Sequence, residues 1–326
     1  MRWILVPVRI VVLIFVLLGA YIAGAAASGM MSVRPSPATE IAPVEDPPAQ
    51  PESVAEPEPG DAASSDTVEA DLAAAAAALW SLLIILGVCT LETIVLAYPI
   101  LRSHWGGWKL VVAIMWVFFG VKSFQSQIEG MYFKVLPFSM SLRVMLMGAV
   151  IAAIFAPAAV LILGRRKAVA SAALDESETS MNARQWALRL GAAALIYVAL
   201  YTVFGHYIAW QSEAVREYYG STSDGSGLPG TFTIPTLGPL QAARGLLWVA
   251  LGLPIIRMMQ GPWWEAALAT GLVFAVVMNA QLLLPNAYMP FDVRMVHLVE
   301  TAPSNFIFGF VIGWLFRRRV GRMTPA

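Results

Sequence analysis

Three polar side chains lie at helical spacing inside one long apolar stretch of the chain. Lys122, Gln125 and Glu129 occupy positions i, i+3 and i+7 of the segment 109–130, which places them on one face of a helix. At the rise of an α-helix, Lys122 lies about 12 Å inside the nearer end of this segment. A charged group at that depth in hydrocarbon needs a partner or water, so the spacing indicates a buried ion pair or a hydrated site.

Further ionisable and amide side chains fall near the corresponding ends of other apolar segments. We expect them to converge on a polar pocket that opens to the outside, with these lining residues: Lys122, Gln125, Glu129, Arg143, His206, Arg244, Gln281, His297 and Glu300. The predicted function is transport or binding of a small solute, anionic or zwitterionic because the set mixes cations with carboxylates. The alternative is that the same groups only join helices, for example Lys122 with Glu129.

A second chemistry is suggested by His297 and Glu300, which share a helix face and which His206 can approach. A membrane-embedded enzyme acting on a lipid-like substrate would use His206 or His297 as general base, with Glu300 or Glu129 as its partner. A histidine and a carboxylate also suit zinc. The chain has no His-Glu-x-x-His motif and one cysteine, Cys89, so neither a metal nor a cofactor is predicted.

Several functional classes lack their motifs. The chain has no Walker phosphate loop, no Rossmann glycine fingerprint and no Ser-His-Asp arrangement in a suitable context. Its basic residues are spread over short loops, which excludes a nucleic-acid interface. The expected partners are membrane lipids and a small solute, and no oligomeric state is predicted. A non-catalytic membrane subunit that recruits a partner is the third hypothesis.

The composition requires a membrane to position these groups. The chain has 326 residues, of which 58% are hydrophobic and 13% charged. Runs of about twenty apolar residues match the thickness of a bilayer. We predict an all-α polytopic membrane protein with about eight transmembrane helices, at 3–27, 73–101, 109–130, 142–164, 186–210, 240–259, 263–284 and 297–316.

The chain divides into four parts. Residues 1–32 are predicted to be a membrane anchor, or alternatively a signal peptide cleaved near Ala27. Residues 33–72 hold eight prolines, ten acidic residues and one basic residue, which predicts a disordered linker outside the cytoplasm. Residues 73–185 and 186–326 form the first and second halves of the helical bundle.

The basic residues predict an orientation. Of the 21 lysines and arginines, 14 fall at segment ends on one side, including the clusters 165–167 and 317–319. By the positive-inside rule this side is cytoplasmic, so both termini are cytoplasmic and the membrane is an inner (plasma) membrane of bacterial type. The aromatic segment 204–219 lies on the outer side, where it is either an interfacial belt or a gate for a ligand.

One motif is repeated. Pro99-Ile100-Leu101-Arg102 followed by Gly106-Gly107-Trp108 returns as Pro254-Ile255-Ile256-Arg257 followed by Gly261-Pro262-Trp263. The constant offset of 155 residues predicts two parallel four-helix repeats, with solute bound between them. The alternative is that two hairpins acquired the same turn residues independently.

Overall fold

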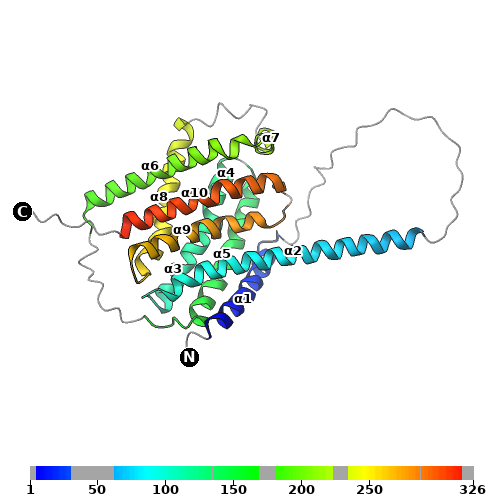
Figure 1. Ribbon diagram of the computed structural model, residues 1–326, viewed down its shortest axis with the longest axis horizontal. Helices are drawn as coiled ribbons and strands as arrows, with labels where there is room; N and C mark the ends of the chain where they lie inside the picture. Colours follow the sequence, from blue (N-terminus) through cyan, green and yellow to red (C-terminus); the bar gives the residue numbers. More distant parts are fainter. Residues whose placement is uncertain are drawn as a thin grey trace, which may run out of the picture.

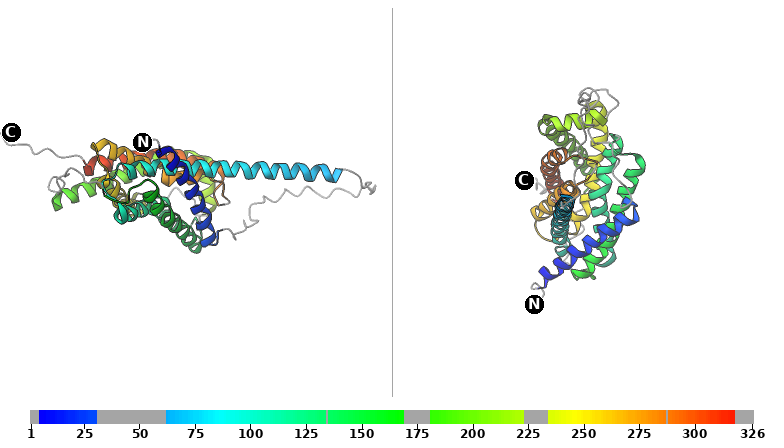
Figure 2. Two further views of the ribbon diagram at one scale, coloured as in Figure 1. Left: turned by 90° about the horizontal axis from the view of Figure 1, so that it is seen from below. Right: turned by 90° about the vertical axis from the view of Figure 1, so that its right-hand side faces the viewer.

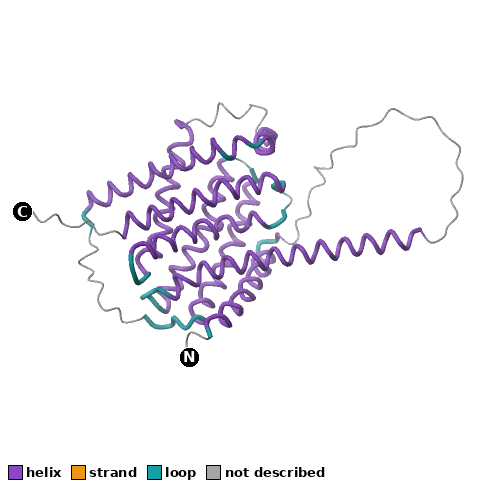
Figure 3. The backbone as a smooth tube through the Cα atoms, in the orientation of Figure 1, coloured by secondary structure: helices purple, strands orange, loops and turns teal. Residues whose placement is uncertain are grey.

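The computed structural model describes residues 5–30, 62–133, 135–168, 181–222, 234–286 and 288–317. Within these ranges the chain is helical, without strands (Figure 3). The elements in chain order are α1 Val6–Ala27, α2 Ala62–Leu101, α3 Gly107–Phe119, the π-helix η2 Gly120–Phe124, α4 Gln125–Tyr132, α5 Phe138–Ile162, α6 Ala183–Tyr207, the 3₁₀-helix η4 Ala209–Gln211, α7 Glu213–Thr222, α8 Ile234–Met258, α9 Trp263–Asn279, the 3₁₀-helix η6 Ala280–Leu283 and α10 Phe291–Arg317.

Eight helical runs in the described residues are long and apolar enough to cross a membrane. The α3–η2–α4 run forms one of them and α9–η6 another, so the eight correspond one to one with the apolar segments of the sequence. The prediction of an all-α, multi-pass membrane protein is therefore confirmed. The runs pack side by side into one bundle (Figure 1).

Three helix starts differ from those expected by six residues or more. α2 begins at Ala62, so residues 62–72, expected to belong to the disordered linker, are helical; the rest of the linker up to residue 61 lies outside the described residues. Alanine and glutamate favour helix even without an apolar face, which accounts for the extension. As a result, α2 is 40 residues long and projects well beyond the bundle (Figures 1 and 2). α8 begins at Ile234 and α10 at Phe291, each six residues before the predicted starts at 240 and 297.

The closest helix pair, α9 and α10, meets through small residues. A Cβ atom on Gly309 would lie 2.7 Å from the Cα of Gly271, and one on Gly313 would lie 2.3 Å from the Cα of Ala267. Gly309 and Gly313 form a Gly-x-x-x-Gly motif, which lets helix backbones approach closely in a membrane.

At one end of the bundle, the α2–α3 and α8–α9 connections pair with each other. Ser103 and Met259 form an isolated antiparallel bridge. Two backbone hydrogen bonds of 2.8 Å flank it: the amide of His104 donates to the Met258 carbonyl, and that of Gln260 to the Arg102 carbonyl. The two repeated motifs of the sequence thus lie against each other.

The turns in these connections depend on glycine. Gly107 and Gly261 have φ values of 56° and 103°, where a side chain is strained. Beside Gly261, the Arg102 guanidinium and the Glu265 carboxylate form a 2.6 Å ion pair. This end of the bundle carries arginine side chains from several connections, among them Arg165 and Arg317.

The helix contacts divide the bundle into two groups, α1 to α5 and α6 to α10. α1 packs against α2 and α5, and α6 packs against α8 and α10. α3 packs against α5 as α9 does against α10. Between these two groups of helices, α2 contacts α9 and α3 contacts α8. The short helix α7 lies across the end of the bundle opposite the paired connections (Figure 1).

Candidate functional site

The third span changes helix type where its polar residues begin. Between α3 and α4, the amide of Gln125 bonds to the carbonyl of Gly120, the i to i+5 pattern of a π-helix. This wider turn rotates Lys122 relative to the residues of α4. A simple α-helical count predicts that Lys122 and Glu129 share one face and the same surroundings. In the structure they do not.

Lys122 instead belongs to a closed cluster among α1, α2 and η2. Its Nζ lies 2.6 Å from Oε1 of Glu92, and the hydroxyl of Tyr21 donates to Oε2 of Glu92 at 3.0 Å. The side chains of Lys122 and Glu92 are 3% and 0% exposed. The Lys122 ammonium also lies over the Tyr21 ring. This cluster is satisfied internally and has no access to a ligand.

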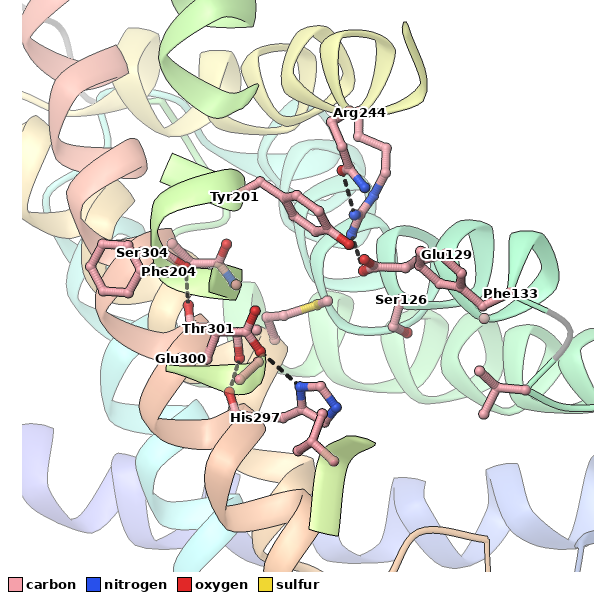
Figure 4. A pocket seen from close by; sticks show the side chains of 18 of the residues that line it. Ser126, Glu129, Phe133, Tyr201, Phe204, Arg244, His297, Glu300, Thr301 and Ser304 are labelled. Carbon is pink, nitrogen blue, oxygen red and sulfur yellow. Dashed lines mark hydrogen bonds and ion pairs between the residues drawn. The ribbon is translucent and has the colours of Figure 1, made fainter. Parts of the chain in front are cut away.

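A cavity of about 490 Å³ lies at the α7 end of the bundle. Its walls come from α4, α6, α7, α8, α9, α10 and the turns that join them (Figure 4). Six of the nine predicted site residues line it: Glu129, His206, Arg244, Gln281, His297 and Glu300. Lys122, Gln125 and Arg143 do not belong to the lining.

One side of the cavity is formed by an ion pair between α8 and α4. Nη2 of Arg244 lies 2.9 Å from Oε2 of Glu129. Nη1 of Arg244 donates to Oε1 of Gln241 at 2.8 Å, and the guanidinium lies 5.8 Å from the centre of the Tyr197 ring. The Arg244 side chain is 3% exposed and that of Glu129 is 26% exposed. Tyr201 directs its hydroxyl at the Glu129 carboxylate (Figure 4).

The opposite side is formed by a hydrogen-bonded chain from α10 to α7. Nδ1 of His297 lies 2.8 Å from Oε2 of Glu300, and Nε2 of His297 lies 3.0 Å from the Tyr219 hydroxyl. Burial, then the negative charges of Glu129 and Glu300, raise the pKa of Tyr219 well above its ordinary value. Tyr219 therefore keeps its proton near neutral pH and holds α7 against His297.

The remaining predicted residues have structural partners or lie elsewhere. The amide of Gln281 donates to the backbone carbonyls of Lys122 and Met278 at 3.2 and 3.0 Å, so it supports the π-helix from the cavity wall. Gln125 is buried behind Arg244 and donates to its carbonyl at 3.2 Å. Arg143 is exposed on α5, and His206 lines the cavity edge with an exposed ring.

The sequence did not identify every lining residue. Tyr197, Tyr201 and Gln241 face the charged groups but lie within apolar or mixed stretches that give no signal of their own. Tyr219 belongs to the aromatic segment for which a gate was one of two hypotheses, and the structure places it against the cavity. The fold, rather than local spacing, brings these aromatic groups together.

The described residues contain no group of three or more His, Cys, Asp or Glu side chains arranged to hold a metal ion. Four of the ionisable groups that line the cavity form two pairs, Glu129–Arg244 and His297–Glu300. The arrangement can therefore offer charge, hydrogen bonds and aromatic surface to an organic molecule. Comparison with protein-family models, with curated proteins and with solved structures finds no match for this chain.

Proposed function

We propose that this chain is a multi-pass inner-membrane protein that binds and transports a small solute in the cavity beneath α7. The observation that carries the proposal is that two separate polar pairs, the ion pair Glu129–Arg244 and the hydrogen-bonded pair His297–Glu300, face the same cavity. Charged side chains within membrane spans are costly and are kept where they serve a pathway or a binding site.

The size of the cavity supports this function. A volume of about 490 Å³ lies within the range of small-molecule sites. Its walls are mostly apolar and aromatic with a few convergent polar groups, which is the usual composition of such a site. A purely structural role for the pairs would not require a space between them.

The proposal includes two parallel four-helix repeats, α1 to α5 and α6 to α10, with α7 as an insertion. The neighbours α1–α2, α1–α5 and α3–α5 correspond to α6–α8, α6–α10 and α9–α10. Across the halves, α2–α9 corresponds to α3–α8. The two backbone hydrogen bonds that flank the Ser103–Met259 bridge are also equivalent. Their donors, and likewise their acceptors, are 156 residues apart in the sequence, as a two-fold axis through the bridge requires.

The orientation follows from the arginine residues. The end of the bundle with the paired connections carries Arg102, Arg165, Arg257 and Arg317. By the positive-inside rule, this end is cytoplasmic and the cavity opens to the outside. Both termini are then cytoplasmic.

The test uses the full-length protein, purified in detergent and then in liposomes. A panel of amines, amino acids, carboxylates and sugars is screened for a concentration-dependent rise in Tm. We expect at least one class to stabilise the protein and to be taken up, and Glu129→Gln and His297→Ala to abolish both effects. Lys109→Ala, at the other end of the bundle, is the control. A hit that survives both cavity substitutions contradicts the proposal, and so does a panel without any hit.

A second candidate is a membrane-embedded enzyme acting on a lipid-like substrate. The observation in its favour is that Glu300 orients His297, as a carboxylate orients a general base. Nε2 of His297 is occupied by Tyr219, so α7 must move before His297 accepts a proton from a substrate. Lipid turnover that is lost in His297→Ala would support this function over transport.

A further inference from the structure

The charged surface that faces the cavity is mostly carboxylate. Glu129 is 26% exposed and Glu300 10% exposed, whereas Arg244 is 3% exposed. Arg244 is the single arginine or lysine among the lining residues that the structure describes. An incoming ligand therefore meets negative groups before it meets the guanidinium.

Both terminal nitrogens of the Arg244 guanidinium are already engaged, while its Nε is buried without a hydrogen-bond partner. One terminal nitrogen faces Glu129, the other faces Gln241, and the guanidinium lies against the Tyr197 ring. An anionic ligand would have to break the ion pair with Glu129 and leave that carboxylate uncompensated. Breaking a buried ion pair in this way is strongly unfavourable in free energy, because one charge is left without a partner. Arg244 thus holds Glu129 in position and is not a docking group for an anion.

A third acceptor lies beside the carboxylates. Gln127 is 9% exposed and lines the cavity, and its side-chain oxygen has no hydrogen-bond partner. Its nitrogen is placed by a 3.4 Å contact with Ser126. A buried acceptor without a partner is unfavourable unless a donor arrives, which indicates that the natural occupant of the cavity donates hydrogen bonds. Nε2 of Gln241, which also lines the cavity, is a buried donor without a partner, so the occupant has room to offer an acceptor as well.

The rest of the wall is aromatic. Phe133, Tyr201, Trp210 and Tyr219 all line the cavity. The faces of such rings attract a cation, most strongly when water is excluded. Carboxylates, an unpaired acceptor and aromatic faces are together complementary to a positively charged group with N–H donors.

We infer that the cavity takes a small protonated amine, whose ammonium group binds between Glu129, Glu300 and the side-chain oxygen of Gln127. This inference rests on the proposed function, since it names the class of solute. It differs from the expectation from sequence, which was an anionic or zwitterionic solute.

The test compares three ligands of one shape and different charge: benzylamine, benzyl alcohol and benzoate. Each is titrated into the full-length protein by isothermal calorimetry at neutral pH, where benzylamine is protonated. We expect benzylamine to bind, benzyl alcohol to bind at least about tenfold more weakly, and benzoate not to bind. Glu129→Gln and, separately, Glu300→Gln should each weaken benzylamine by about tenfold or more.

Controls separate binding from folding. Glu265→Gln removes a carboxylate at the opposite end of the bundle and should leave benzylamine affinity unchanged. Glu129→Asp keeps the charge and should retain more affinity than Glu129→Gln even if both lower Tm. Benzoate binding in place of benzylamine would overturn the ligand class and leave the proposed function standing. Failure of benzylamine to bind, or unchanged binding in both glutamine variants, also overturns the ligand class. A solute panel without a hit overturns the proposed function as well.

Discussion

Lys122 and Glu92 approach to 2.6 Å across two neighbouring spans, and at most 3% of either side chain is exposed. Neither belongs to the cavity lining. Each charge, left alone in this position, would carry the full penalty of an unpaired ion away from water. The pair therefore joins η2 to α2 and stabilises the fold.

Removing one member of this pair should destabilise the protein strongly. We expect Glu92→Gln or Lys122→Met alone to lose about 3–5 kcal/mol, because the remaining partner stays buried and uncompensated. The double variant Glu92→Leu/Lys122→Met should recover most of that loss. Thermal unfolding in detergent, followed by circular dichroism, measures the effect. Single variants that melt with the wild type would contradict the role assigned to the pair.

The contact between α9 and α10 allows no added volume. Gly313→Ala places a methyl group 2.3 Å from the Cα of Ala267, so the helices must separate. We expect a loss of about 1–3 kcal/mol, measured as a fall in Tm. Gly191→Ala is the matched control: it lies on α6 with nothing within 4 Å of the added carbon, and should be neutral or slightly stabilising. Equal effects of the two substitutions would argue against close packing at Gly313.

His104 gives the α2–α3 connection a pH dependence. Burial lowers its pKa below the ordinary value, and the positive charges of Lys109, Arg317 and Arg165 act in the same direction. A hydrogen bond to the Met258 carbonyl opposes them. Its Nδ1 is buried without a hydrogen-bond partner. The folded protein therefore binds a proton here less readily than the unfolded chain does.

The sign of the effect follows from linkage. Above the ordinary pKa of 6.5 the residue is neutral in both states and has no effect. As the pH falls below that value, stability decreases until the lowered pKa of the folded state is passed. We expect Tm to fall more in the wild type than in His104→Gln between about pH 8 and about pH 5. Parallel Tm curves for the two proteins would refute this.

Tyr219 should hold α7 over the cavity. Tyr219→Phe removes the hydroxyl that meets His297, and the expected loss is about 1 kcal/mol of local stability. Hydrogen exchange of the amides in α7 should become faster, with the spanning helices unchanged. Tyr207→Phe, at a side chain that is 69% exposed, is the control. Unchanged exchange in α7 would show that other contacts hold it.

The spans could be predicted because the signal is long. A run of about twenty apolar residues is identified without knowing any partner, and the apolar spans other than that of α10 begin within four residues of the predicted positions. The prediction started α10 too late because Asp292 and Arg294 lower the local hydropathy of the sequence. The helix begins earlier since Pro290 and Asp292 favour a helix start. The contact of Gly309 and Gly313 with α9 was not among the sequence predictions and is known from the structure.

The site could be predicted only in part. Counting residues from the segment ends predicts how deep each polar side chain lies in the bundle. This works for Glu129, Arg244, His297 and Glu300, since each lies near a segment end. Their pairing does not follow from such a count, because Glu129 and Arg244 are 115 positions apart and meet through packing of whole helices. The partner of Lys122 was missed for a different reason: a count of 3.6 residues per turn does not hold through a π-helix.

The π-helix makes the register of the third span sensitive to length. Deleting a single residue from Gly120–Phe124 would restore an ordinary α-helix and turn everything after the deletion by about 100°. Glu129 would then swing away from Arg244, and Gln125 would leave the backbone of α8. A difference of one codon in this short stretch therefore separates an assembled cavity from one in which a buried arginine faces no counter-charge.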